Sequence, residues 1–255
     1  MANDTSAPHD RAAEVERLLD SDETMLGRFW QYEKLGLTPQ EMAEQEETAT
    51  FGWVYNCRRL VRVLRDGEVP TAPAVAQQAA RKVRAWLKNN SLSNQLRLQL
   101  EDQEKLLSSR AEDRQAQTEE TVAAVKASES AEAAGTPGIY VYTLPHYLRH
   151  PIDPDTGKTL LKVGHSTKDA YYRAGSANRL TALPEDPILL RIYPTSESSA
   201  AEKEFHTWLR SADHSGARGN RTGTEWFVTS LKFLDRIAAS LKLEIRAITD
   251  FDLVE

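Results

Sequence analysis

The sequence predicts an α+β protein, in which an all-α N-terminal domain precedes a small antiparallel β-sheet of about three strands flanked by helices. Two observations predict this class. From Arg11 to about Arg110, apolar residues recur every three or four positions, as in amphipathic helices. At Gly138 the composition changes to β-branched and aromatic residues that alternate, as in a half-buried strand. We therefore expect a helical domain, a linker and a second domain over residues 1–107, 108–135 and 136–255.

Length and composition fit a globular protein with room for two small domains. Of the 255 residues, 40% are hydrophobic and 27% are charged, and no apolar run approaches the roughly 18 to 20 residues that a membrane-spanning helix needs. The N-terminus lacks the basic start and apolar stretch of a secretory signal. Cys57 is the one cysteine, which excludes an internal disulfide and a multi-cysteine zinc site. We expect a cytoplasmic protein without a membrane partner, with Cys57 a small buried hydrophobe.

Start and stop signals divide the helical half. A first helix is expected from Arg11 to near Gly36. Thr38 is a candidate N-cap, because proline follows at the first helical position and glutamate stands three residues after the cap. Two more helices are expected over about 50–65 and 74–88. Residues 108–135 are too polar to anchor to a core, so they predict a solvated helical or flexible linker.

The second domain is expected to alternate strands and helices in the order β, β, α, β, α, α. The first two strands can pair as an antiparallel hairpin with a long connection. The expected strands cover residues 138–143, 159–164 and 187–193, and the expected helices cover about 168–180, 198–210 and 231–241.

Several short motifs stand in order on these elements. Gly138-Ile139-Tyr140 begins the first strand and Lys162-Val163-Gly164 ends the second. Arg173 follows in a helix, Glu202 and His206 share the next helix, and Glu225-Trp226-Phe227 comes last. Together with the element order, they resemble the GIY-YIG nuclease family, in particular a phage-associated branch whose second motif begins with lysine. The resemblance covers about 110 residues. It implies an endonuclease that hydrolyses phosphodiester bonds of DNA with Mg²⁺ or Mn²⁺.

Hydrolysis of a phosphodiester needs a base, cations that stabilise the charge growing on the phosphate, and usually a metal ion. Tyr140 projects from the face opposite Ile139, and the resemblance implies that it acts as base or relay. Arg173 is expected to hold the scissile phosphate, with Arg179 as a second phosphate contact. Without the resemblance, Tyr140 is more simply a half-buried strand tyrosine, and Arg173 is a surface partner of Asp169.

Glu202 is the expected metal ligand. It and His206 flank the apolar stripe of their helix, where a ligand that points into a cleft must lie, and a lone carboxylate completed by water is the usual way to hold magnesium. The alternative is a solvated helix pair. Lys162 and His165 are expected to assist Tyr140 as cations. Since the family's second motif commonly begins with tyrosine, the identity of the base stays open, and a site that does not cut is an alternative.

Two further segments carry interpretations of their own. Glu225-Trp226-Phe227 is expected to be structural, with its aromatic rings packing the last helix onto the sheet. Residues 58–88 hold eight basic residues against two acidic ones, and a basic face of this kind can follow a phosphate backbone. The residues assigned to DNA on this face are Arg58, Arg59, Arg62, Arg65 and Lys82. A solvated face or a protein-binding surface explains the same residues.

The net charge of −6 argues mildly against a nucleic-acid partner, although the acidity lies in residues 1–135, whereas residues 136–255 hold 15 basic and 15 acidic residues. Three functions therefore compete. The first is the metal-dependent DNA endonuclease, and the second is an inactive GIY-YIG-like module that binds nucleic acid or protein. The third makes the helical half a self-association or interaction module, with the second half as an accessory.

Overall fold

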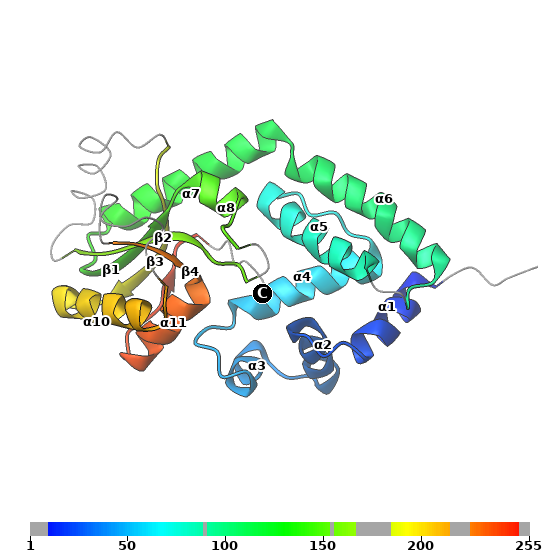
Figure 1. Ribbon diagram of the computed structural model, residues 1–255, viewed down its shortest axis with the longest axis horizontal. Helices are drawn as coiled ribbons and strands as arrows, with labels where there is room; N and C mark the ends of the chain where they lie inside the picture. The colour runs from blue at the N-terminus through cyan, green and yellow to red at the C-terminus, as the bar shows by residue number, and fades with distance from the viewer. Residues whose placement is uncertain (1–9, 89–90, 154–155, 167–184, 215–224, 250–255) are drawn as a thin grey trace, which may run out of the picture. The chain divides into compact units, whose positions relative to one another are not determined.

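The computed structural model describes residues 10–88, 91–153, 156–166, 185–214 and 225–249. Within these residues it contains ten helices and a five-stranded antiparallel sheet, which confirms the predicted α+β class (Figure 1). The sheet is larger than the expected three strands. The chain divides into two compact units, one formed by residues 1–46 and 51–114 and the other by 47–50 and 115–255.

The first unit is a bundle of six helices: α1 (Arg11–Asp20), α2 (Met25–Leu35), α3 (Pro39–Gln45), α4 (Gly52–Asp66), α5 (Pro73–Leu87) and α6 (Asn94–Ala111). The expected first helix is two helices. The Thr24 side chain accepts a hydrogen bond from the amide of Leu26 and so starts α2. A side chain at Gly27 would lie 1.7 Å from the carbonyl oxygen of Asp22, so this glycine allows the sharp entry into α2.

Other helix signals appear where the sequence predicts them. Thr38 and Glu41 form a complete capping box at the start of α3. Helix α4 ends at Gly67, whose φ of 73° is the left-handed conformation that glycine adopts easily. Cys57 lies on the buried face of α4, and burial raises the pKa of its thiol to about 12. It is therefore a packing residue, as expected.

The second unit contains α7 (Arg114–Ala133, which begins at the unit boundary), β1 (Gly138–Thr143), α8 (Pro145–Arg149), β2 (Thr159–Ser166), β3 (Ile188–Pro194), α10 (Ser198–Ser211), β4 (Trp226–Thr229), α11 (Leu231–Ser240) and β5 (Arg246–Ala247). The strand order is β4-β2-β1-β3-β5, and every neighbouring pair is antiparallel. β1, which carries the first motif, is thus the central strand. The hairpin expected from β1 and β2 is present, with Tyr140 directly opposite Gly164.

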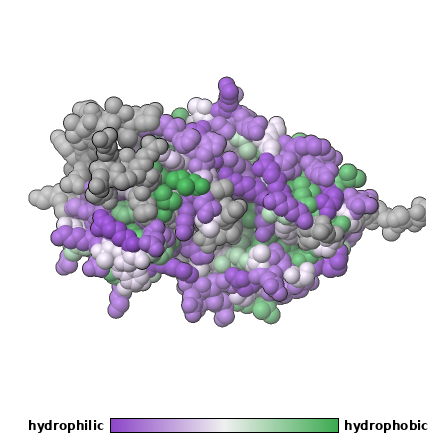
Figure 2. All heavy atoms as spheres, viewed as in Figure 1, coloured by the Kyte–Doolittle hydropathy of each residue, from purple (hydrophilic) through white to green (hydrophobic). Residues whose placement is uncertain are grey.

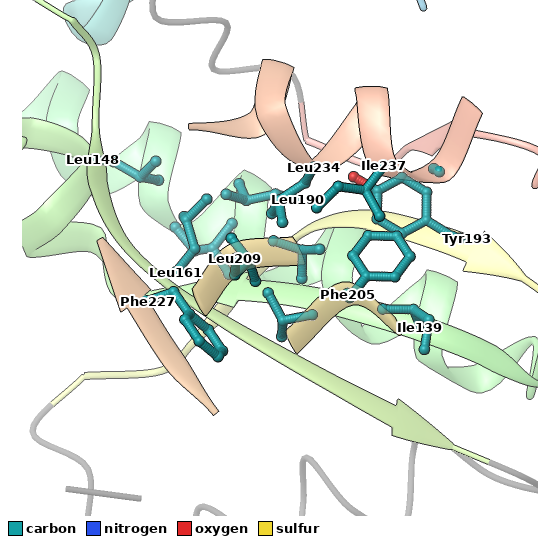
Figure 3. Packing of buried hydrophobic residues seen from close by; sticks show 14 of the residues in the cluster. Ile139, Leu148, Leu161, Leu190, Tyr193, Phe205, Leu209, Phe227, Leu234 and Ile237 are labelled. Atoms are coloured by element: carbon teal, nitrogen blue, oxygen red, sulfur yellow. The ribbon is translucent and has the colours of Figure 1, made fainter. Parts of the chain in front are cut away.

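One face of this sheet packs against α10 and α11 and forms the main core of the unit (Figure 3). Ile139 and Val141 from β1 meet Phe205 from α10 and Ile237 from α11 there. Three buried polar side chains connect α11 with β3. Asp235 of α11 accepts a hydrogen bond from the Tyr193 hydroxyl at 2.8 Å and lies 3.5 Å from the Arg191 guanidinium. The remaining labelled members of the core are Leu148, Leu161, Leu190, Leu209, Phe227 and Leu234.

The opposite face of the sheet is covered by α7, so the strands lie between α7 and the pair α10 and α11 (Figure 1). The expected linker is therefore helical, and its second half packs on the sheet. Where the β1–β3 ladder shifts register, the amide of Leu189 donates a hydrogen bond of 2.8 Å to the hydroxyl of Ser128 on α7. Near the end of α7, Glu132 accepts a hydrogen bond from Tyr142 of β1 at 3.0 Å. These hydrogen bonds hold α7 on the sheet, since the helix lacks a continuous apolar stripe.

The surface in view is largely hydrophilic, with hydrophobic residues in small separate areas (Figure 2). Among the helices that the structure describes, none combines the length and the apolar character needed to cross a bilayer.

Candidate active site

The three residues of the first motif have three different environments on β1. A side chain at Gly138 would lie 2.4 Å from the carbonyl oxygen of Tyr193, so the close approach of β3 requires glycine here. Ile139 is buried in the core beneath α10. Tyr140 projects from the opposite face, as predicted, where it packs with Leu189 and Ile192.

Tyr140 is only 3% exposed. Its hydroxyl donates a hydrogen bond to the carbonyl of Thr136, in the short segment between α7 and β1. A carbonyl acceptor stabilises the phenol and not the phenolate. In this arrangement Tyr140 holds its proton, so a role as base requires its hydroxyl to leave Thr136 and to give up that proton.

The second motif lies on β2, and it gathers charged groups. Lys162 forms an ion pair with Glu225, with 3.3 Å between Nζ and Oε2. Val163 is buried in the core. A Cβ atom built on Gly164 would lie 3.7 Å from Oε2 of Glu225 and 3.9 Å from Oε1 of Glu202. Two carboxylates thus approach the same point beside β2, and the absence of a side chain at Gly164 leaves that point open to them.

His165 follows this glycine and contacts the predicted metal ligand. Its Nδ1 lies 2.6 Å from Oε2 of Glu202, on α10. An ionised carboxylate can only accept, so this contact places a proton on Nδ1. The side chains are 20% and 16% exposed, so both are reachable from solvent. One carboxylate oxygen of Glu202 therefore binds His165, and the other is turned toward Gly164.

His206 is farther inside. It is 8% exposed, its ring lies 4.9 Å from that of Phe227, and its Nε2 donates to the carbonyl oxygen of Val163 at 2.9 Å. Since a carbonyl cannot donate, Nε2 carries the proton. His206 ties α10 to β2 and thereby fixes Glu202, one helical turn before it, against Gly164.

Glu225 is the residue of this site that the sequence interpretation missed, because the whole Glu225-Trp226-Phe227 segment is expected to be structural. Phe227 is indeed buried in the core. Glu225, however, precedes β4, and its carbonyl accepts a hydrogen bond from the amide of Val163 at 2.8 Å. That backbone bond brings its carboxylate to Lys162 and Gly164. The available signal was the place of Glu225-Trp226-Phe227 among the elements of the family resemblance, but the pairing that brings Glu225 to Lys162 is visible only in the fold.

Arg173 and Arg179 lie outside the described residues, so their predicted phosphate contacts stay predictions. Across the ranges that the structure describes, no group of three or more His, Cys, Asp or Glu side chains is arranged to hold a metal ion. Oε1 of Glu202, which faces Gly164 beside a partly exposed strand, still fits Mg²⁺, which takes one or two carboxylates and completes its shell with water and phosphate oxygens. The donor set is compatible with the expected cofactor.

Residues 138–242 match the family model of the T5orf172 domain. The T5orf172 domain is a phage-associated domain of the nuclease type, and this match supports the predicted nuclease class of function. The match begins at the first residue of β1 and ends just after α11, so the T5orf172 domain contains the two motifs, His165, Glu202, His206 and Glu225. Helix α7 and strand β5 lie outside it. No curated protein and no solved structure significantly matches the chain.

The basic face predicted in the helical unit is less basic than the sequence suggests. Arg58 pairs with Glu33, and Arg62 lies 3.4 Å from Glu68. Arg65 is 2.9 Å from Asp66, and Arg84 is 2.6 Å from Glu104. Asp66 and Glu68 belong to the same stretch, whereas Glu33 and Glu104 come from other helices of the bundle and offset part of the local excess. DNA contacts by this face, including Arg59 and Lys82, stay a prediction separate from the T5orf172 domain.

Proposed function

We propose that the T5orf172 domain is a metal-dependent DNA endonuclease of the GIY-YIG type. The observation that carries this proposal is the approach of Glu202 and Glu225 to one point at Gly164, flanked by Lys162 and His165. Carboxylates and cations side by side suit a phosphodiester, whose hydrolysis needs both a metal ligand and charge stabilisation.

Glu202 would hold Mg²⁺ or Mn²⁺ through Oε1, the oxygen turned toward Gly164. The metal ion, when bound, would act as a Lewis acid on the phosphate and lower the pKa of bound water. Oε2 stays with His165, which keeps the carboxylate in one orientation. His206 would support this geometry through its bond to β2.

The remaining roles concern protons and charge. After its hydroxyl leaves the Thr136 carbonyl, Tyr140 would act as a relay that passes its own proton to solvent as it takes the proton of the attacking water. Lys162 and Arg173 would bind the non-bridging oxygens of the phosphate. The side chains of Lys162 and Tyr140 project from the same face of the sheet, since their cross-strand partners are Tyr142 and Gly164.

A binding module without catalysis is the second candidate, and one observation favours it. The hydroxyl of Tyr140 is bound to a carbonyl, and the position where tyrosine is common in the second motif holds a lysine that is already paired with Glu225. A domain with these two features can bind a phosphate backbone without cutting it.

Nicking of supercoiled plasmid separates the two candidates. The wild-type protein should nick DNA with Mg²⁺ or Mn²⁺ and lose this activity in EDTA. Glu202→Gln and Arg173→Ala should each lower the rate by at least about 100-fold, whereas Glu204→Gln, an exposed glutamate on the same helix, should change it by less than about twofold. Wild-type protein that retains the plasmid and leaves it intact would establish the binding module instead.

A further inference from the structure

Glu225 is held against β2 by its backbone while its side chain reaches the polar cluster. Its carbonyl accepts from the amide of Val163 at 2.8 Å, and β4 begins with the next residue. Its carboxylate lies 3.3 Å from Nζ of Lys162, and the two side chains are 40% and 33% exposed. The pair is anchored by a strand and remains accessible to a substrate.

Lys162 needs such a partner to have a defined position. A lysine side chain has four rotatable bonds and loses much rotamer entropy when its ammonium is fixed. Across the β1–β2 pair it stands opposite Tyr142, on the same face as Tyr140. The ion pair with Glu225 brings the ammonium toward Gly164, the point that Glu202 approaches from α10.

The pair contributes little to folding. An ion pair between two side chains that are each about one third exposed stabilises the folded state by about 0 to 1 kcal/mol. Solvent screens the attraction, and ordering the two side chains costs entropy. The position of this pair beside Gly164 distinguishes it from ion pairs elsewhere on the surface of the unit. Arg149 and Glu185, for example, are 3.4 Å apart and are 34% and 33% exposed, and neither approaches Gly164 in the described structure.

We propose that Glu225 is a positioning residue that acts through Lys162: its carboxylate holds the ammonium beside Gly164, where the ammonium contacts a phosphate of the substrate. This inference rests on the proposed nuclease function. It assigns Glu225 a role that differs from that of Glu202, because Glu225 orients a cation and does not hold the metal ion.

A double-mutant cycle tests the proposal with full-length protein, plasmid nicking and a DNA duplex for binding. Glu225→Gln and Lys162→Met should each lower kcat by about tenfold, with Tm unchanged within about 2 °C. The double variant should be no slower than Lys162→Met alone. Neither change should move the Mg²⁺ or Mn²⁺ concentration that gives half-maximal nicking. Glu185→Gln removes the matched ion pair and should leave kcat within about twofold.

Two outcomes would overturn the proposal. If Glu225→Gln slows the Lys162→Met protein as much as it slows wild type, Glu225 acts independently of the lysine. If Glu225→Gln alone raises the metal concentration required, Glu225 is a metal ligand. Should wild-type protein fail to nick, the nuclease proposal fails, and the positioning role is judged on the duplex Kd. Lys162→Met should then weaken binding severalfold in wild type and less than twofold beside Glu225→Gln, whereas equal effects would refute it.

Discussion

The hydroxyl of Tyr142 donates a hydrogen bond of 3.0 Å to Oε1 of Glu132, a residue of α7 that is 7% exposed. Burial raises the pKa of the Glu132 carboxyl, the hydrogen bond from Tyr142 lowers it, and Glu129 raises it slightly further. The net effect is a raised pKa in the folded protein. A carboxylate under the sheet that carries Tyr140 therefore opposes the stability of α7 at neutral pH.

Glu132→Gln should raise the stability of the second unit near pH 7. In the folded protein the carboxyl takes up a proton at higher pH than in the unfolded chain, so its contribution is fully present below the unfolded pKa, near 4.3, and is lost as pH rises through the folded pKa. Thermal unfolding should show a Tm several degrees higher for the variant at pH 7, with the two proteins converging near pH 4. Equal Tm values at pH 7 would show that interactions with its neighbours fully offset the cost of burying the Glu132 carboxylate at that pH.

Gly164→Ala should preserve the fold and remove the activity. The added methyl group would contact Glu202 and Glu225 at ordinary van der Waals distances, 3.9 and 3.7 Å from one oxygen of each. Gly164 is not among the glycines with positive φ. We expect a change in unfolding free energy below about 1 kcal/mol and a fall in nicking of at least about tenfold, since an apolar group separates the two carboxylates.

Gly138→Ala is the informative contrast. Its Cβ would lie 2.4 Å from a backbone oxygen of β3, so a strand must shift, and stability should fall by about 1 to 3 kcal/mol. Circular dichroism melts of both variants, beside their nicking rates, would distinguish the two glycines. A Gly164→Ala protein with wild-type activity would show that the point between the carboxylates is not used.

The buried group formed by Arg191, Tyr193 and Asp235 should dominate mutational loss of stability in the second unit. Asp235→Asn removes the carboxylate that lies 3.5 Å from the Arg191 guanidinium, whose side chain is 2% exposed. Removal of one member of a buried ion pair costs about 3 to 5 kcal/mol. Denaturant unfolding followed at the tryptophans would measure this loss, and a cost below about 1 kcal/mol would contradict the role assigned to the pair.

Tyr193 also links stability to alkaline pH. Burial, and then the neighbouring Asp235 carboxylate, raises the pKa of its hydroxyl well above the usual value near 10. Its contribution is present below about pH 10 and is lost as pH rises above that value, because the unfolded chain then ionises and the folded protein does not. Tyr193→Phe should flatten the fall in Tm between about pH 9.5 and 11, whereas Tyr55→Phe, at a tyrosine that is 50% exposed, should not.

The basic face of the helical unit should contribute less to DNA affinity than its charges suggest. Arg58, Arg62 and Arg65 must each leave an acidic partner to contact a phosphate. With the five predicted residues (Arg58, Arg59, Arg62, Arg65 and Lys82) changed to Gln, the slope of log Kd against log salt should change by less than about 2. A change of about 4 or more would establish this face as a full DNA-binding surface.

The elements that the sequence predicts best are those in which the pattern of apolar and polar residues follows the pattern of buried and exposed positions. The expected strand 138–143 and the observed β1 coincide, because β-branched and aromatic residues alternate between two buried faces. β5 has two residues and escapes any periodicity. The packing of helix α7 on the sheet also cannot be predicted from the pattern, since Ser128 and Glu132 bind the sheet through polar contacts. Glu225 joins the site through a strand pairing distant in sequence, which no local pattern encodes.

Helix α7 changes where the functional unit begins. The family match starts at Gly138, yet the acceptor for Tyr140, the partner of Tyr142 and the hydroxyl that binds Leu189 all come from the preceding residues. A shorter fragment that begins at Gly138 would expose the aromatic side chains of Tyr140 and Tyr142. It would also remove the hydrogen-bond partners of the hydroxyls of these two tyrosines and of the amide of Leu189. A fusion that joins this domain to a foreign domain should therefore keep the chain from about residue 114 and attach the foreign domain before it.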